Sequence, residues 1–225
     1  MVMQYLFSCM PNTFVGVEST ISAIRISRYL VEAKGNHQRA LRLYVWNAAI
    51  CEAFYFPAQI VEVAIRNRLH HSLANKFGSD WYASSAFFSP LPNRLKNELE
   101  AAIRKCQRDH GPQLTINHII AAMSLGFWCH ILTSWFESQL WQDGLQEAFP
   151  HIPTDISRQQ AYDKIDQFRH WRNRIAHHGA VFDKSPMKEL KNMEEVLSWI
   201  CPETLWFMRQ FNDVQKAIGR KPVRH

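Results

Sequence analysis

The stretch RHWRNRIAHHG, residues Arg169–Gly179, combines a helical pattern with a dense set of basic side chains and histidines. On a helix with about 100° per residue, the apolar side chains, among them Phe168 and Ile175, fall on one face. Arg172 lies in the middle of that face. An apolar face seldom contains an arginine, because an unpaired buried charge is costly. Arg172 is therefore expected to have a buried acid or an anionic ligand as its partner.

A polar stripe runs beside this face and includes Asn173 and His177. Histidine is the side chain that titrates near neutral pH without help. A histidine that moves a proton and an arginine that stabilises charge on phosphorus oxygens are suited to metal-independent RNA cleavage. Symmetric pairing of two chains would bring a second Arg–His set into the same cleft. The alternative is that Arg172 is locked to an acid for structural reasons and that the histidines are ordinary polar surface.

A second informative stretch, AQIVEVAIRNRLHHSLANKF, covers residues 58–77 and ends before Gly78. Its apolar repeat consists of Ile65, Leu69, Leu73 and Phe77. Glu62 and Arg66 lie one turn apart inside this stripe, which indicates a buried ionic network. If this helix packs against the one that carries Arg172, Glu62 would hold and orient one or both arginines. The alternative is a pair that is purely structural.

The same helix contains a second copy of the pattern RNxxxH, formed by Arg66, Asn67 and His71. The repetition is either a duplicated function or chance in a chain with 26 Lys and Arg and 11 His. The sequence leaves open which of the two copies lines a cleft.

Composition indicates a globular, all-helical protein. The chain has 225 residues, of which 47% are hydrophobic and 20% are charged, and only 8 are glycines. This composition excludes a disordered chain and favours helices over strands. The formal net charge of +6 favours polyanionic partners, and the alternative is a soluble basic protein without such a partner.

Metal and thiol chemistry are not indicated. The five cysteines are widely spread and include no CxxC pair, so neither a disulfide framework nor a zinc site is predicted, and a reducing cytoplasm is the expected setting. Adjacent histidines point about 100° apart on a helix, so the pairs His70–His71 and His177–His178 cannot easily chelate one metal ion. No metal and no cofactor are expected.

The chain is predicted to have an irregular segment over residues 1–18, one helical domain over residues 19–218 and a basic tail over residues 219–225. The expected helices cover residues 19–34, 37–56, 58–77, 93–110, a long helix capped by Thr154 or Asp155, and residues 186–200 and 202–218. Pro57 is expected to break or kink the chain. The uncharged segment from Gly111 to Phe136 is long enough for a membrane span but contains many polar residues, which favours either a buried core helix or a helix pair broken near Ser124. No membrane association is expected.

Several ordered motifs carry a family resemblance. LRLYVWNAAICEAF, IVEVAIRNRLHHSL, FGSDWY, SLGFW and RNRIAHHGAVF follow one another along most of the chain. In this order they resemble the bacterial Abi-like (abortive infection) proteins of the HEPN superfamily. The hallmark of that superfamily is an arginine followed, after four to six residues, by a histidine, and Arg172 and His177 match it with four residues between them.

The resemblance implies an all-α, HEPN-like helical bundle with additional helices, which forms a homodimer whose two Arg–His motifs face one cleft. It implies a metal-independent endoribonuclease that acts in phage defence or as a toxin, with an antitoxin or regulatory protein as a further possible partner. The alternative is a non-catalytic helical module that binds RNA, nucleotide or a partner protein. By resemblance, the catalytic set is Arg172, Asn173 and His177, and the supporting set is Glu62, Arg66 and His178.

Overall fold

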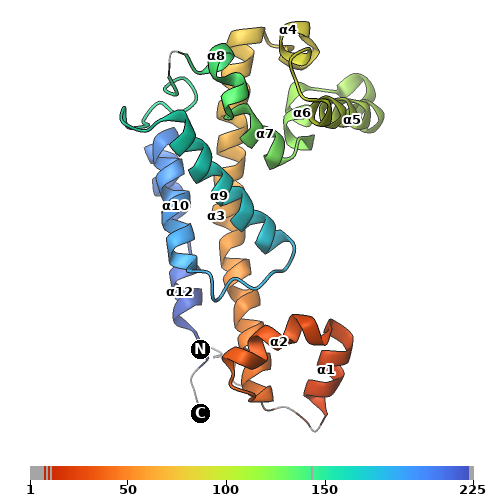
Figure 1. The fold of residues 1–225 in the computed structure, drawn as a ribbon, viewed down its shortest axis with the longest axis vertical. Helices are drawn as coiled ribbons and strands as arrows, with labels where there is room; N and C mark the ends of the chain where they lie inside the picture. The colour runs from red at the N-terminus through yellow and green to blue at the C-terminus, as the bar shows by residue number, and fades with distance from the viewer. Residues whose placement is uncertain (1–7, 9, 11, 143, 223–225) are drawn as a thin grey trace. The chain divides into compact units, whose positions relative to one another are not determined.

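The computed structural model describes residues 8, 10, 12–142 and 144–222, and these residues form an all-helical chain without strands (Figure 1). In chain order the α-helices are α1 (Thr13–Ile21), α2 (Ala23–Glu32), α3 (His37–Phe77), α4 (Ser85–Phe88), α5 (Asn93–His110), α6 (Ile116–Ala122), α7 (Leu125–Ile131), α8 (Glu137–Leu140), α9 (Arg158–Ala176), α10 (Pro186–Ile200), α11 (Pro202–Gln210) and α12 (Val214–Gly219). Short 3-10 turns are η1 (Trp81–Ala83), η2 (Gly111–Gln113) and η3 (Ser134–Phe136). The all-α prediction is confirmed.

The chain divides into two compact units. Unit 1 consists of the described residues of Met1–Pro57, Asn173–Leu190 and Phe211–His225. Unit 2 consists of the described residues of Ala58–Arg172 and Lys191–Gln210. Helices α3, α9 and α10 each contribute residues to both units.

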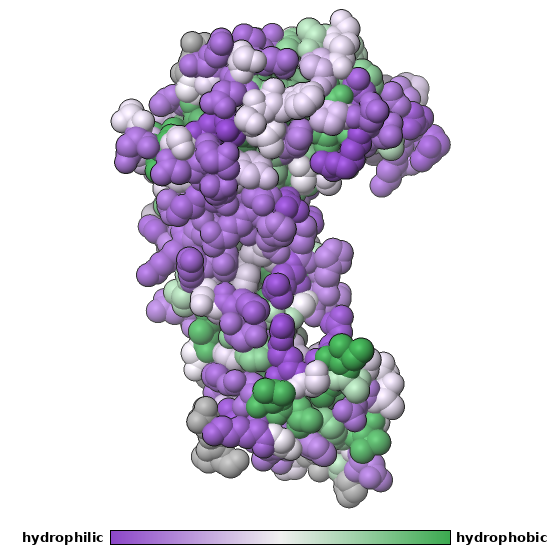
Figure 2. Space-filling model, in the orientation of Figure 1, coloured by the Kyte–Doolittle hydropathy of each residue, from purple (hydrophilic) through white to green (hydrophobic). Residues whose placement is uncertain are grey.

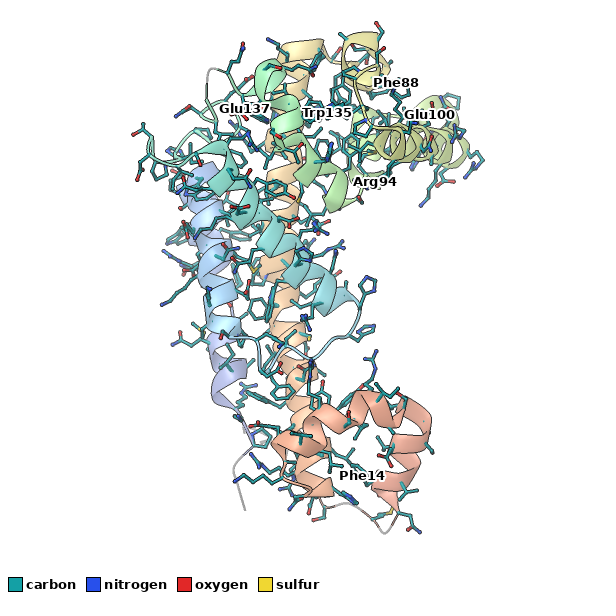
Figure 3. All side chains as sticks on the ribbon, viewed as in Figure 1. Phe14, Phe88, Arg94, Glu100, Trp135 and Glu137 are labelled. Atoms are coloured by element: carbon teal, nitrogen blue, oxygen red, sulfur yellow. The ribbon has the colours of Figure 1, made fainter. Side chains whose placement is uncertain are left out.

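Unit 1 packs aromatic side chains of α2 and α3 around the segment that follows α9. The ring of Tyr29 lies 5.1 Å from those of Tyr44 and Phe182. The buried Trp46 donates a hydrogen bond from its indole nitrogen to the carbonyl of Ala217, at 2.8 Å. Phe14, labelled in Figure 3, stacks on His37 at the start of α3 with ring centroids 3.9 Å apart.

Hydrophobic side chains also reach the surface of unit 1. Figure 2 shows green side chains over the part of the chain that holds α1 and α2. Val15 of α1 and Ile24 and Val31 of α2 are exposed, and Ile24 is 89% accessible. Much of the accessible surface of folded proteins is apolar, so exposed residues of this kind are common.

Unit 2 has the predicted apolar repeat of α3 in its core. Ile65, Leu69 and Leu73 are fully buried, and they share the core with residues that include Trp81, Phe87, Trp128, Phe136, Ile165 and Phe168. Trp135, labelled in Figure 3, is half-exposed on this unit. Its indole nitrogen donates a hydrogen bond to the Pro90 carbonyl at 2.9 Å. The period-four pattern therefore identifies the core face of α3 at three of its four positions, and Phe77 at the end of the helix is half-buried.

The N-terminal helices differ from the prediction of an irregular segment over residues 1–18 followed by one helix. α1 begins at Thr13, and the chain breaks at Ser22 before α2. Ser22 has a φ of 88°, and its hydroxyl accepts a hydrogen bond from the Arg25 amide at 3.4 Å. A serine in this position ends one helix and caps the next. Residues 1–7, 9 and 11 of the predicted irregular segment lie outside the described residues.

A break or a kink was expected at Pro57, and the break is absent. Pro57 lies inside the 41-residue α3. Proline removes one backbone hydrogen bond and costs a helix interior about 3 kcal/mol. The fully buried side chains of Phe54 before it and Val61 after it show that tertiary packing on both sides outweighs this cost.

Of the two arrangements expected for the uncharged segment, the structure shows the helix pair and not a single buried core helix, since α6 ends at Ala122 and α7 begins after Ser124. The Ser124 hydroxyl caps α7 by accepting a hydrogen bond from the Phe127 amide at 3.1 Å. Each of these helices has 7 residues, well below the roughly 20 that a membrane span requires. Among the described helices, α3 alone has the length and hydropathy of a span, and 39% of its apolar window is buried.

The C-terminal third keeps its predicted helices but not all of their ends. α9 is capped by Ser157 instead of Thr154 or Asp155, because Ser157 and Gln160 exchange side-chain-to-backbone hydrogen bonds at 3.2 and 2.8 Å. α10 covers the predicted residues 186–200. The predicted helix 202–218 is split into α11 and α12, and Asn212 accepts from the Val214 amide at 2.9 Å at the start of α12.

The predicted basic tail, residues 219–225, is attached to unit 1 at Lys221. Its ammonium group lies 2.9 Å from a carboxylate oxygen of Glu32 and 5.6 Å from the ring centroid of Trp46. Residues 223–225 lie outside the described residues. The prediction of one domain over residues 19–218 stays a prediction.

Candidate functional site

The carboxylate of Glu62 lies between two arginines in unit 2. Arg172 of α9 donates from Nε to Oε2 at 2.7 Å and from Nη2 to Oε1 at 3.2 Å. Arg66, one turn along α3, donates from Nη2 to the same Oε1. Glu62 is 8% exposed. The prediction that Glu62 holds one or both arginines is confirmed, and it holds both.

This cluster carries an excess positive charge in a largely buried place. Burial lowers the pKa of the Arg66 guanidinium and the charge of Arg172 adds to this effect, while the charge of Glu62 opposes it. Arg66 also donates from Nη1 to the Ala121 carbonyl at 3.3 Å. Two cations that share one carboxylate leave the cluster with a net positive charge, which favours an anion nearby.

The two arginines differ in exposure. The side chain of Arg172 is 36% exposed, compared with 15% for Arg66. Arg172 is thus fixed by a bidentate contact with Glu62 while part of its surface is open to solvent. A fixed and accessible guanidinium has the properties needed to contact a phosphate.

Only one residue of the second RNxxxH copy belongs to the cluster around Glu62. Arg66 belongs to it, whereas Asn67 and His71 are exposed on α3. No contact among the described residues joins Asn67 or His71 to Glu62. The neighbouring His70 accepts a hydrogen bond from the Trp81 indole at 2.9 Å, and burial lowers the pKa of its imidazole.

The predicted catalytic residues are positioned by two sets of contacts. Arg172 belongs to unit 2, whereas Asn173, His177 and His178 belong to unit 1. Asn173 lies in the last turn of α9, and its carbonyl accepts a hydrogen bond from the His177 amide at 2.9 Å. The positions of His177 and His178 within unit 1 are therefore set by the turn that ends α9.

α9 ends in a Schellman motif around the histidine pair. The Gly179 amide donates to the Arg174 carbonyl at 2.8 Å, and the His178 amide donates to the Ile175 carbonyl at 3.0 Å. His178 takes the left-handed position, with a φ of 56°. This turn leaves both histidine side chains exposed. An exposed imidazole at His177 satisfies the requirement that a proton-transfer group be accessible.

Gly179 is required by the close approach of the chain to Arg174. A Cβ atom at this position would lie 2.8 Å from Cγ of Arg174 and 3.1 Å from its carbonyl oxygen. The side chain could move away, but the carbonyl belongs to the helix backbone. The sequence HHG therefore encodes a specific turn.

Asn47 of α3 holds the segment that follows this turn, and the sequence did not reveal its role. The buried Asn47 side chain accepts from the Val181 and Phe182 amides at 2.7 and 3.2 Å, and donates to the Gly179 carbonyl at 3.3 Å. A single amide side chain thus satisfies three backbone groups of one segment. The one feature of the sequence that could have indicated this role is an asparagine that stands alone within the apolar helical pattern of residues 37–56.

Replacing Asn47 by alanine is expected to lower the free energy of unfolding by about 2 kcal/mol or more, because two backbone N–H groups lose their acceptor. Asn47→Asp keeps an acceptor for both and should cost less. Urea unfolding of the two variants and the unchanged protein measures the effect. A wild-type unfolding midpoint for the alanine variant would show that Asn47 does not hold the segment.

Replacing His178 by glycine is expected to raise the free energy of unfolding by about 0.5–1 kcal/mol, because glycine adopts a positive φ without steric cost. His177→Gly is the matched control, since His177 does not have a positive φ and gains nothing from glycine. Thermal unfolding followed by circular dichroism measures both changes. Equal destabilisation of the two variants would show that the positive φ of His178 costs the folded chain nothing that glycine relieves.

A further polar cluster lies on α9 within unit 2. Arg169 donates from Nε to Asp166 at 2.7 Å, and the exposed His170 lies 3.3 Å from the other oxygen of Asp166. This cluster follows the predicted polar stripe. The nearby Cys129 is not a candidate nucleophile, because burial raises the pKa of its thiol to about 12.

Among the described residues, no three His, Cys, Asp or Glu side chains are grouped so that they could hold a metal ion. The absence of a metal and of a cofactor stays a prediction from the sequence. The polar groups that the structure brings together are carboxylates paired with arginines, namely Glu62 with Arg66 and Arg172, and Asp166 with Arg169.

Comparison with known proteins gives one match. A family model described as Abi-like protein matches residues 20–183, and this range includes every residue proposed for the site. No curated protein and no solved structure matches the chain. The matched residues make up well over half of the chain.

Proposed function

The chain belongs to the Abi-like protein family, and we propose that it is a metal-independent endoribonuclease of the HEPN type that acts in abortive infection or as a toxin. Membership of this family suggests a role in defence against phages. The observation that carries the proposed activity is Arg172, which is held by Glu62 and is partly exposed; the sequence places the exposed His177 five residues later.

In the proposed reaction the ribose 2′-oxygen attacks the adjacent phosphorus, and the bond from phosphorus to the 5′-oxygen breaks. His177 takes the proton of the 2′-hydroxyl or gives a proton to the leaving 5′-oxygen. Arg172 stabilises the charge that develops on the non-bridging oxygens. Asn173 is proposed to contact the same phosphate, and Glu62 is a positioning residue that fixes Arg172.

One histidine cannot perform both proton transfers at once, so a second group is required for the full rate. We propose a homodimer in which the motif of a second copy supplies that group. A cytoplasmic location, an RNA substrate and control by an antitoxin or regulatory protein belong to the same proposal. Arg66 and His178 have supporting roles, and Asn67 and His71 form the secondary motif.

The end groups of the cleavage products test this chemistry. A labelled RNA incubated with the purified chain is expected to give fragments with 2′,3′-cyclic phosphates and 5′-hydroxyls, because the nucleophile is internal to the substrate. Phosphatase sensitivity and mass spectrometry of the fragments identify the ends. Fragments with 5′-phosphates would show that water or a hydroxide attacks instead, and would contradict the proposed role of the 2′-hydroxyl.

One observation favours a second candidate, a non-catalytic helical module that binds RNA, nucleotide or a partner protein. Unit 1 contains a largely apolar groove of about 770 Å³, lined by residues that include Tyr44, Cys51, Tyr55, Ile175 and His178. Mostly apolar pockets with a few polar groups are typical of ligand sites. If the purified chain binds RNA without cutting it, this second candidate takes the place of the first.

A further inference from the structure

A cleft of about 560 Å³ in unit 1 lies between α2 and the turn that ends α9. Its polar lining includes Ser22, Arg25, Ser27, Arg28, His178 and Gly179. None of the described residues that line it is acidic. The cleft therefore offers two guanidinium groups beside His178, together with two serine hydroxyls that also bond to the α2 backbone.

Arg25 ties α2 to the histidine pair. It donates from Nη1 to the His178 carbonyl at 2.8 Å, and its side chain is exposed. This bond uses one of the five N–H donors of a guanidinium. The remaining edge of Arg25 is positioned next to the residue that follows His177.

Arg28 is one turn further along α2 and makes a long ionic contact. Its Nε lies 3.8 Å from Oδ2 of Asp183, and the ammonium group of Lys184 lies 3.9 Å from the same oxygen. The side chain of Arg28 is 46% exposed. Two cations share the one carboxylate of Asp183, so these three side chains together keep a positive charge.

The buried side of the cleft adds no negative charge. Tyr29 lies there with 2% of its surface exposed, and burial raises the pKa of its hydroxyl, which stays neutral. Arg174, which is exposed, donates to the Ala180 carbonyl at 3.5 Å and adds a further cation to the same turn. On the side of α2, the charged side chains next to His178 are thus cations, while Glu52 lines the separate apolar groove that also contains His178.

We infer that this cleft binds the phosphodiester backbone of single-stranded RNA, with Arg25 and Arg28 contacting successive phosphates beside His177. The inference rests on the proposed function, because it assigns the path of the substrate of that site. Arginine forks match phosphate geometry, and such contacts position a strand without reading its sequence. The same contacts serve a single-stranded DNA, which separates backbone recognition from recognition of the ribose.

The test measures binding apart from cleavage. His177→Ala protein is titrated with a fluorescently labelled, unstructured single-stranded RNA over a series of salt concentrations, with and without Arg25→Gln/Arg28→Gln. The matched control is Arg104→Gln/Arg108→Gln on α5 of unit 2, which removes the same charge from an exposed surface. Each lost phosphate contact lowers the slope of log affinity against log salt by about 0.7 for single strands, so the double variant should lose about 1.4.

The expected result is weaker binding and a reduced salt slope for the α2 variant, on RNA and on a DNA of the same sequence, with little change for the α5 control. Equal changes in affinity and salt slope for the two double variants would overturn the inference. Cleavage of RNA by the wild-type chain would still support the proposed function in that case. Weaker binding of RNA alone would also overturn the inference, because contacts with phosphates do not distinguish single-stranded RNA from single-stranded DNA. If Arg25→Gln disturbs folding, Arg28→Gln alone should show about half of the change in slope.

Discussion

Replacing Glu62 by alanine is expected to lower the free energy of unfolding by more than about 2 kcal/mol, because two arginines lose the carboxylate that they share. Arg66 is the more buried of the two, with 15% of its side chain exposed. Without Glu62 the two guanidinium groups repel each other, and burial of Arg66 is no longer compensated. Urea unfolding of the variant and the unchanged protein measures the difference.

Glu100 provides the matched control for this prediction. It is labelled in Figure 3 and pairs with Arg104 one turn away on α5, at 3.2 Å, and 45% of its side chain is exposed. An exposed pair of this kind contributes between zero and about 1 kcal/mol. Glu100→Ala should therefore leave stability nearly unchanged. Equal unfolding midpoints for the two alanine variants would show that Glu62 has no special role.

Replacing His177 by alanine is expected to lower the rate of RNA cleavage by at least about 10²-fold, because a positioned histidine supplies that much in proton transfer. The free energy of unfolding should change little, since His177 is exposed. The comparison separates a chemical role from a structural one. Loss of stability together with activity would indicate that the histidine supports the turn instead.

His71→Ala is the matched control for the activity, because His71 occupies the same position in the second RNxxxH copy and is also exposed. We expect this variant to cut RNA like the unchanged protein. If the two substitutions had reversed effects, the copy on α3 would be the catalytic one and Arg172 with Glu62 would be structural.

The features that the sequence predicted are those encoded by residues close together in the chain. The four-residue repeat of Ile65, Leu69 and Leu73 identified the buried face of α3. The position of Glu62 inside that repeat identified the acid that binds the arginines. Local periodicity and the cost of burying a charge were sufficient for both conclusions.

The features that were missed depend on distant residues or on rare conformations. Asn47 bonds to groups 132 to 135 positions away, and no local pattern indicates such partners. His178 occupies a left-handed position that usually carries glycine. Pro57 was expected to break or kink the chain, and the break is absent because buried side chains on both sides keep α3 continuous through it.

Cleavage of a labelled RNA in the presence of EDTA, by wild-type and His177→Ala protein purified in parallel, tests the proposed ribonuclease most directly. We expect the wild-type chain to cut the RNA at a rate that the chelator does not change, and the variant to fall to the background rate. Equal cleavage by both proteins would contradict the assignment of His177. Intact RNA with both proteins would contradict the proposed endoribonuclease activity.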